Sequence, residues 1–247
     1  MLLELHEKYT IDGLKQIDNI HDKMATEILK GSFVNDLCEL TDEYTKVNNT
    51  LKKYLQKRKE KGLLDYSAFY QSHWGKLSAL HCMSNSNNES PEITQQNIIN
   101  WLDFFEFLIL NVDEMILNAK INEFQYILGT YVEELKFKIS SLLDTHDVFE
   151  AKYRAMGMII HMIEDSYTVS HCKRDDLEII TFYCYSEQSA GVHKKNDFVL
   201  VEHEEKMLSD INDVLIRLLN EESANSNYQE IFKISTSALP SSDGGFV

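Results

Sequence analysis

The chain has 247 residues, 43% of them hydrophobic and 26% charged, with only 2 Pro and 9 Gly, which excludes wholesale disorder and turn-rich β-sandwiches or β-barrels. Forty acidic against 24 basic residues give a net charge of −16, a field that repels nucleic-acid backbones and anionic membranes at long range. A substrate that carries phosphate would therefore need a local source of positive charge, such as bound divalent cations.

Apolar residues recur every three or four positions along most of the chain, which is the spacing of helices that bury one face. The predicted helices cover, in chain order, about 4–29, 33–59, 66–80, 92–116, 122–143, 148–167, 177–186 and 197–219. A loop is expected at 84–91, where Ser, Asn and Pro accumulate. The sequence predicts an all-α fold with a single compact multi-helix domain over 1–220, followed by a loosely ordered C-terminal tail at 221–247.

The cysteines and the chain ends point to the protein's environment. Four cysteines are scattered without any CxxC spacing, which favours free thiols over a disulfide framework or a Cys-type zinc finger. No run of 18 apolar residues occurs, and the N-terminus lacks the features of a signal peptide. We expect a soluble protein with no transmembrane segment, either cytoplasmic or secreted by a route that needs no such peptide.

The stretch HMIEDSYTVSH at 161–171 carries the clearest chemical pattern. His161 and Asp165 are four positions apart on a predicted helix, so both side chains lie on one face and can reach one metal ion. His171 follows six residues later, where a helix that ends near residue 167 lets the chain turn back toward the same cavity. The alternative is a buried core histidine beside a solvated carboxylate, because a single His-x3-Asp is common in helices.

A second His-x3-Asp pair, His193 and Asp197, follows about twenty residues later and favours the metal interpretation. Imidazole nitrogen and carboxylate oxygen are the ligands expected for a catalytic Zn²⁺ with open coordination positions. The helical domain is therefore predicted to surround a metal-binding cleft.

This order and spacing resembles the zinc-dependent phospholipase C and fungal single-strand nuclease superfamily, an all-helical fold that holds a trinuclear zinc cluster. The family motif is His-x3-Asp-x5-His, followed some twenty residues later by His-x3-Glu in the phospholipases or His-x3-Asp in the nucleases. The family also has a His near the N-terminus and an Asp followed about fifteen residues later by a His. The matching positions here are His6, within HEKYT, and the pair Asp65 and His81.

The resemblance implies three zinc positions with nitrogen and oxygen ligands. The first would take four side chains: Asp65, His81, His161 and Asp165. The second would take three: His171, His193 and Asp197. The third would take His6, a shared oxygen of Asp165, and the backbone amine and carbonyl of Met1, where the family has Trp.

Two or three close Zn²⁺ ions would supply hydroxide at neutral pH and clamp phosphoryl oxygens. We therefore expect a metal-dependent phosphoric diester hydrolase, most closely a phospholipase C that cleaves glycerophospholipid head groups. Asp65 is also the candidate catalytic base. Lys173 and Arg174 follow His171 after one intervening residue and are candidates for binding the substrate phosphate, although a solvated pair is the alternative.

Two other functions stay open at this stage. One is a zinc-dependent single-strand nuclease, for which nucleic acid would be the substrate, and which the Asp at 197 favours. The other is a non-catalytic helical interaction or effector protein with a structural or degenerate metal site. Glu164 is expected either to be solvated or to hydrogen-bond a ligand, His73 is a substitute ligand for Asp65, and three histidines without partner spacing are expected at the surface: His21, His146 and His203.

Overall fold

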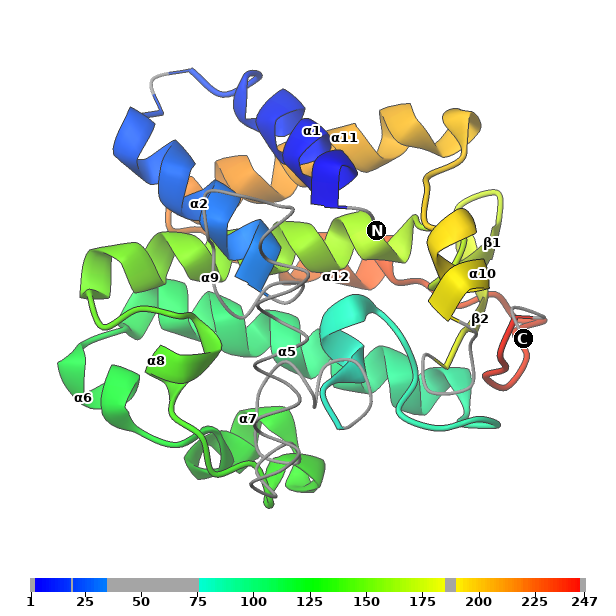
Figure 1. Cartoon of the computed structure of the whole chain (residues 1–247), viewed down its shortest axis with the longest axis horizontal. Coiled ribbons are helices and arrows are strands. Elements are labelled where there is room, and N and C mark those ends of the chain that lie inside the picture. The colour runs from blue at the N-terminus through cyan, green and yellow to red at the C-terminus, as the bar shows by residue number, and fades with distance from the viewer. Residues whose placement is uncertain (1–2, 19, 35–75, 185–189, 245–247) are drawn as a thin grey trace.

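The computed structural model describes four ranges of the chain: 3–18, 20–34, 76–184 and 190–244. Within these ranges the protein is mainly helical, as the sequence predicts, with one small two-stranded antiparallel sheet (Figure 1). Most of the helix expected at 33–59 lies outside the described residues, as do Met1, Asp65 and His73.

Long helices form the body of the described protein, and short helical turns connect them. The long helices are α1 (Leu3–Leu14), α2 (Asp22–Val34), α5 (Pro91–Asn111), α9 (Val148–Ser166) and α11 (Val201–Leu219). The shorter elements are η2 (Ser78–His81), α6 (Glu114–Asn118), η3 (Ile121–Phe124), α7 (Gln125–Leu128), η4 (Thr130–Val132), α8 (Ile139–Leu142), α10 (Ala190–Lys195) and α12 (Asn225–Ile231). The sheet pairs β1 (Cys172–Asp175) with β2 (Glu178–Phe182).

The helix predicted at 148–167 is confirmed nearly residue for residue as α9, and the helix predicted at 92–116 is confirmed as α5 except that it ends five residues earlier, at Asn111; both begin with strong capping signals. Ser90 accepts a hydrogen bond from the backbone N–H of Ile93, and proline fills the first helical position of α5. Asp147 caps α9 by accepting from the N–H of Glu150 at 2.9 Å. The helix expected at 197–219 is also present as α11, although it begins four residues later.

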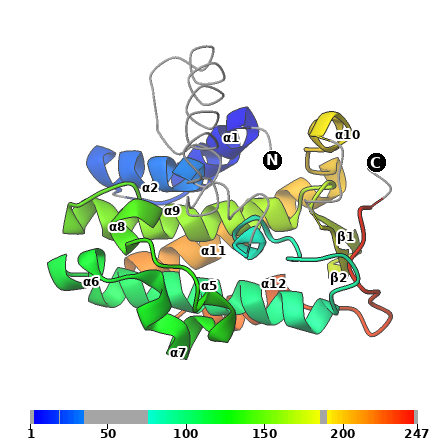
Figure 2. The same cartoon turned by 60° about the horizontal axis from the view of Figure 1, so that its bottom comes forward.

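Helix α9 is the central element of the fold. It runs between α1 and α2 on one side and α5 on the other (Figures 1 and 2), and it packs against α11 as well. Every residue from Arg154 to Ser166 is buried, so the polar residues at its C-terminal end lie inside the protein. Polar groups in such a place must find partners or bind a charged ligand.

Two glycines allow α2 to lie unusually close to α9. A Cβ atom on Gly157 would lie 2.0 Å from the carbonyl oxygen of Ile28, and one on Gly31 would lie 2.2 Å from that of Arg154. Neither position can hold a larger residue without separating the helices. The close approach brings the carbonyl oxygen of Ser32 to 2.8 Å from Nδ1 of His161.

Three predicted helices differ from the structure. The helix expected at 4–29 is two helices, α1 and α2, separated by a turn. The helix expected at 122–143 is a series of short helices and 3-10 turns, and the first of the α-helices, α7, ends just before Gly129, whose φ is +88°. The helix expected at 177–186 is instead strand β2, whose Ile, Ile, Thr and Phe residues suit a partly buried strand.

The expectation of a loosely ordered tail after residue 220 is wrong for the described part of that segment. Helix α12 follows, and its Tyr228 and the adjoining Phe232 are fully buried. Ile234 then pairs with Ile179, and Ser242 pairs with Tyr183, so the C-terminal chain lies along the hairpin. Apolar side chains spaced among the polar ones hold this segment against the core.

Two smaller features concern thiols and membranes. The three described cysteines, Cys82, Cys172 and Cys184, are buried and free, in line with the absence of a disulfide framework. None of the helices in the described ranges has the length and apolarity that crossing a lipid bilayer requires.

Candidate metal centre

Five separate parts of the chain bring imidazoles and carboxylates to the C-terminal end of α9. His161 and Asp165 lie one turn apart on α9, which ends at Ser166 as the motif requires. A turn closed by a 3.0 Å bond from the N–H of His171 to the carbonyl oxygen of Thr168 returns His171 toward the helix. The other members come from α1, from the end of η2, from α10 and from the second residue after α10: His6, His81, His193 and Asp197.

Seven of the nine predicted metal ligands are therefore brought together, and all seven side chains are buried. The other two, Met1 and Asp65, lie outside the described residues. We call the seven side chains the histidine cluster. Their exposed fractions rise from 0% for His6, His161 and Asp165 to 7% for His193 and Asp197, so the cluster comes nearest to solvent beside α10.

Asp165 lies at the centre of the histidine cluster. Its Oδ1 is 3.4 Å from Nε2 of His6. Its Oδ2 is 3.0 Å from Nδ1 of His81, 3.0 Å from Nε2 of His161, and 3.3 Å from Nδ1 of His171. One carboxylate thus faces four imidazoles, with its two oxygens directed to different ones, as a bridging ligand would be.

A second group lies on the other side of His171. Nε2 of His171 is 3.5 Å from Oδ1 of Asp197, and Nε2 of His193 is 3.8 Å from the same oxygen. The rings of His171 and His193 stack with centroids 5.2 Å apart. Ser170 donates a 2.9 Å hydrogen bond to Oδ1 of Asp197 and fixes this carboxylate.

The ligand atoms form two triads, and within each triad the three ligand atoms lie within 4.8 Å of one another. One triad is His6, His161 and Asp165, and the other is His171, His193 and Asp197. The second triad is the ligand set expected for the second metal position. His81 adjoins the first triad: its Nδ1 lies 3.0 Å from Oδ2 of Asp165 and 3.0 Å from Nε2 of His161.

Three of the five histidines in the cluster, His6, His161 and His171, share one orientation. Nδ1 of His161 lies 2.8 Å from the carbonyl oxygen of Ser32, Nδ1 of His171 lies 2.8 Å from that of His81, and Nδ1 of His6 contacts the carboxylate of Glu164. Carbonyl and carboxylate oxygens only accept hydrogen bonds, so each of these Nδ1 atoms must carry the proton. Nε2 of each ring is then left facing the cluster, the arrangement that oriented metal-binding histidines adopt.

Two histidines and the central carboxylate of the cluster have charge states that suit cation binding. Burial, together with the charge of His161, lowers the pKa of His6 to about 3. Burial, together with the charge of His171, lowers the pKa of His193 to about 3. Burial opposes ionisation of Asp165, but the neighbouring His171 and His161 hold its pKa well below the usual value. Neutral imidazoles and ionised carboxylates are the forms that bind metals.

Glu164 is not solvated, so the second expectation for it is the correct one. Its side chain is fully buried, contacts Nδ1 of His6, and accepts a 2.9 Å hydrogen bond from the hydroxyl of Thr10. His6 and Thr10 lie one turn apart on α1, so both can reach the same carboxylate. The sequence signal for this contact was the HEKYT segment, but its partner on α9 could not be identified from spacing.

Of the two candidates for binding substrate phosphate, Arg174 has another task. Its guanidinium donates to the backbone carbonyls of Ser166, Leu177 and Ile231, and it lies over the ring of Tyr167. These bonds tie the end of α9 to the hairpin and to α12, contrary to the expected substrate contact. Lys173 is exposed and remains a candidate.

The remaining histidines agree in part with expectation. His21 and His146 are exposed, as predicted. His203 is half-buried, with its ring centroid 6.2 Å from that of Tyr167.

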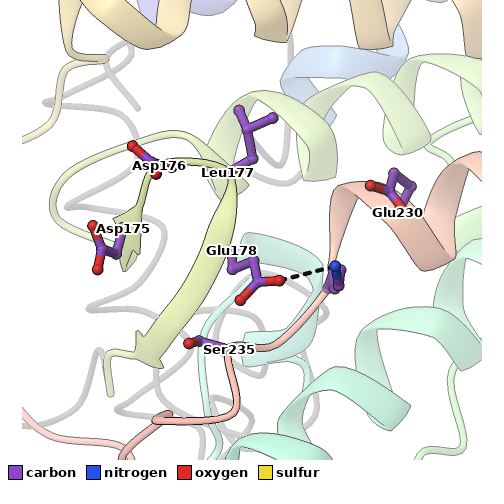
Figure 3. Close-up of a pocket in the computed structure, with 7 residues that line it drawn as sticks. Asp175, Asp176, Leu177, Glu178, Glu230 and Ser235 are labelled. Atoms are coloured by element: carbon purple, nitrogen blue, oxygen red, sulfur yellow. Dashed lines mark ion pairs between the residues drawn. The ribbon is translucent and has the colours of Figure 1, made fainter.

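A hollow of about 390 Å³ lies away from the histidine cluster, between the hairpin turn and the chain after α12 (Figure 3). Its walls carry four carboxylates: Asp175, Asp176, Glu178 and Glu230. Glu178 already pairs with Lys233 at 2.9 Å. No member of the histidine cluster lines this hollow.

Comparisons with protein families, with curated proteins and with solved structures found no match to this chain. The interpretation of the histidine cluster therefore depends on its own geometry.

Proposed function

We propose that the protein is a zinc-dependent phosphodiester hydrolase and, more narrowly, a phospholipase C. The observation that carries the proposal is the position of Asp165, whose two oxygens face four imidazoles at 3.0 to 3.4 Å. These side chains come from positions between 6 and 171, and no local feature of the chain requires them to meet.

A bound metal ion explains the convergence of these imidazoles and carboxylates better than ordinary core packing does. Because Nδ1 of His161 donates to Ser32, Nε2 of a neutral His161 presents a lone pair to the Asp165 oxygen 3.0 Å away. Two acceptors at that distance repel each other unless a positive charge lies between them. A bound cation would supply that charge and would offset the burial of two carboxylates among five histidines.

The number and arrangement of ligands support more than one ion. A structural zinc site is usually closed by four ligands, whereas the histidine cluster offers seven side chains, six in two adjoining triads and His81 beside them. Nitrogen and oxygen donors without thiolates fit catalytic zinc. Two or three such ions would supply Lewis acidity toward a phosphate and a low-pKa water. In this proposal His171, His193 and Asp197 would hold one ion, and His6, His81, His161 and Asp165 would hold the others.

We propose a lipid phosphodiester as the substrate, because the amino-acid sequence of the 161–174 segment resembles the corresponding segment of the phospholipases. A single-strand nuclease is the second candidate, favoured by Asp197 where the phospholipases have Glu. Asp65 and Met1 remain proposed as the base and as a further ligand.

The test begins with zinc content measured on protein purified without chelators. We expect at least two zinc ions per chain and loss of stability in EDTA. The zinc-loaded protein is then given phosphatidylcholine vesicles or single-stranded DNA, and release of phosphocholine or of nucleotides is measured. Less than one zinc per chain, with no effect of EDTA, would instead indicate a non-catalytic interaction protein. Hydrolysis of DNA alone would replace the phospholipase by the nuclease.

A further inference from the structure

The segment between α10 and α11, together with the first residue of α11, exposes three apolar side chains within four residues. Phe198 is 40% exposed, Leu200 is 36% exposed and Val201 is 83% exposed. Val199, between them, is buried and pairs with Thr168, so the segment is anchored by its inward-facing residue. Single exposed apolar residues are ordinary, but a group of three in one short segment marks an interaction surface.

Lysines surround this apolar group. Lys194 and Lys195, in the last turn of α10, are exposed, and so is Lys173 on β1. Lys173 and Leu200 line a common hollow of about 180 Å³. Between residues 190 and 202 the exposed charged side chains are the two lysines and Glu202, so the segment is locally basic on a chain of net charge −16.

The same segment adjoins the histidine cluster. His193 and Asp197 are the two least buried members of the cluster. Lys194 follows His193 in the sequence, and Phe198 follows Asp197. The carbonyl oxygen of Phe198 accepts a 3.0 Å hydrogen bond from the N–H of Val169, in the turn that positions His171. Figures 1 and 2 both show α10 and the hairpin at one end of the molecule.

We propose that this end of the molecule docks on an anionic phospholipid surface. The docking surface consists of six side chains: Lys173, Lys194, Lys195, Phe198, Leu200 and Val201. The apolar side chains enter the boundary between head groups and acyl chains, while the lysines reach anionic head groups. The inference rests on the proposed function for its biological sense, since docking here would bring lipid phosphates to the exposed side of the histidine cluster.

Charge complementarity favours a lipid surface over a second copy of the chain. A strongly acidic protein is repelled by an anionic membrane at long range, so contact requires a local basic patch joined to apolar side chains. The docking surface has both parts. Another copy of the same protein would bring anionic side chains to the lysines but no continuous apolar layer to accept all three apolar side chains.

Sedimentation with vesicles tests the proposal on the full chain. Vesicles of phosphatidylcholine alone are compared with vesicles of phosphatidylcholine and phosphatidylserine, at low and high salt. We expect stronger binding to the anionic vesicles, reduced by salt. Lys194→Gln with Lys195→Gln is expected to weaken the partition on the order of 20-fold, since each lysine near an anionic surface contributes several-fold. Phe198→Ser with Val201→Ser is expected to weaken binding to both vesicle types.

Matched controls separate the docking surface from general effects. Met115→Ser removes a 77% exposed apolar side chain from α6, and Lys136→Gln with Lys138→Gln removes two exposed lysines elsewhere. These controls should bind like the wild type. Equal binding by the docking-surface variants, no binding to anionic vesicles, or a dimer that Val201→Ser dissociates would each overturn the proposal.

A second readout distinguishes this inference from the proposed function. The same variants are assayed on a short-chain phosphatidylcholine that stays monomeric in water. Cleavage of the monomeric lipid without vesicle binding would refute the docking proposal and support the proposed hydrolase. Vesicle binding through the docking surface without cleavage of any phosphodiester would support the docking proposal and refute the proposed hydrolase function.

Discussion

Glu164 on α9 and His6 on α1 are joined by a fully buried hydrogen bond between residues 158 positions apart in the sequence. The other oxygen of Glu164 accepts from Thr10, so the carboxylate holds two successive turns of α1. The N-terminal helix is therefore positioned by a side chain next to Asp165, and the fold and the candidate metal centre depend on the same contact.

Glu164→Gln is expected to weaken zinc binding at the position that includes His6. The amide keeps the size of the side chain but loses the negative charge that orients the imidazole and raises its basicity, a change that typically lowers metal affinity by about 10- to 100-fold. Competition with a zinc chelator measures the effect. The triad of His171, His193 and Asp197 should keep its affinity.

Glu7→Gln is the matched control, because Glu7 is exposed on α1 beside His6. It should bind zinc like the wild type. The same loss in both variants would mean that net charge, and not the contact of Glu164 with His6, governs the affinity.

Gly157→Ala is expected to lower the free energy of unfolding by about 1–3 kcal/mol, the usual range for overpacking. Its Cβ atom would meet the carbonyl oxygen of Ile28 at 2.0 Å, and backbone atoms cannot move aside as a side chain can. Moving α2 outward would also draw Ser32 away from His161, so zinc affinity should fall as well. Urea unfolding and chelator competition measure the two effects.

Gly13→Ala provides the comparison for that loss. Its Cβ atom would meet only the side-chain Cγ2 of Ile211 at 2.7 Å, and this methyl group can rotate away. The gain in helix propensity offsets part of the clash. A Gly13→Ala variant as destabilised as Gly157→Ala would contradict the argument from close helix approach.

The parts of the site that were predictable from sequence are those fixed by short spacing. His161 and Asp165 share a face because α9 is a regular helix, and the helix end that returns His171 lies at the expected place. The approach of His6 and His81 depends on packing over long sequence separations, and only the resemblance to a known family suggested it. Glu164 was ambiguous because nothing in its neighbours reveals a partner on α1.

Errors in the predicted fold have similar physical causes. The sequence predicts a helix at 177–186, where the structure has β2, because a short apolar run does not distinguish the two structures by period alone. The C-terminal segment was expected to be loose because its composition is polar, yet a few apolar residues, among them Tyr228 and Phe232, are enough to hold it against the core. Composition averages over a segment, whereas packing depends on individual side chains.

Acidification is expected to destabilise the zinc-free protein below about pH 6.5. In the folded protein, burial keeps the pKa of His6 and of His193 at about 3, whereas both titrate near 6.5 when unfolded. The unfolded chain therefore binds protons that the folded chain excludes, and stability falls with pH by about 1.5 kcal/mol per histidine between pH 6.5 and 5. Urea unfolding at pH 7, 6 and 5 measures the slope.

His171 acts in the opposite direction and in a different pH range. Burial alone would lower its pKa, but Asp165 raises it above the ordinary value. Its contribution is complete below pH 6.5 and is lost as pH rises through the raised pKa, so it does not cancel the acid loss. His193→Gln should give a shallower slope between pH 6.5 and 5, while His146→Gln, which changes an exposed residue, should not.

Asp165→Asn and Asp197→Asn are expected to differ in how much zinc-dependent stability they remove. Asp165 faces four imidazoles and joins the two triads, so its replacement should abolish binding of more than one ion. Asp197 lies within 4 Å of His171 and His193 in the second triad, so its replacement should affect one ion. Because a ligand that binds only the folded state stabilises it, the wild type should melt several degrees higher when zinc is added. Asp165→Asn should lose nearly all of that increase and Asp197→Asn only part of it. Equal losses in the two variants would show that Asp165 does not bridge the triads, since the shared carboxylate is the sole reason for expecting the first to cost more.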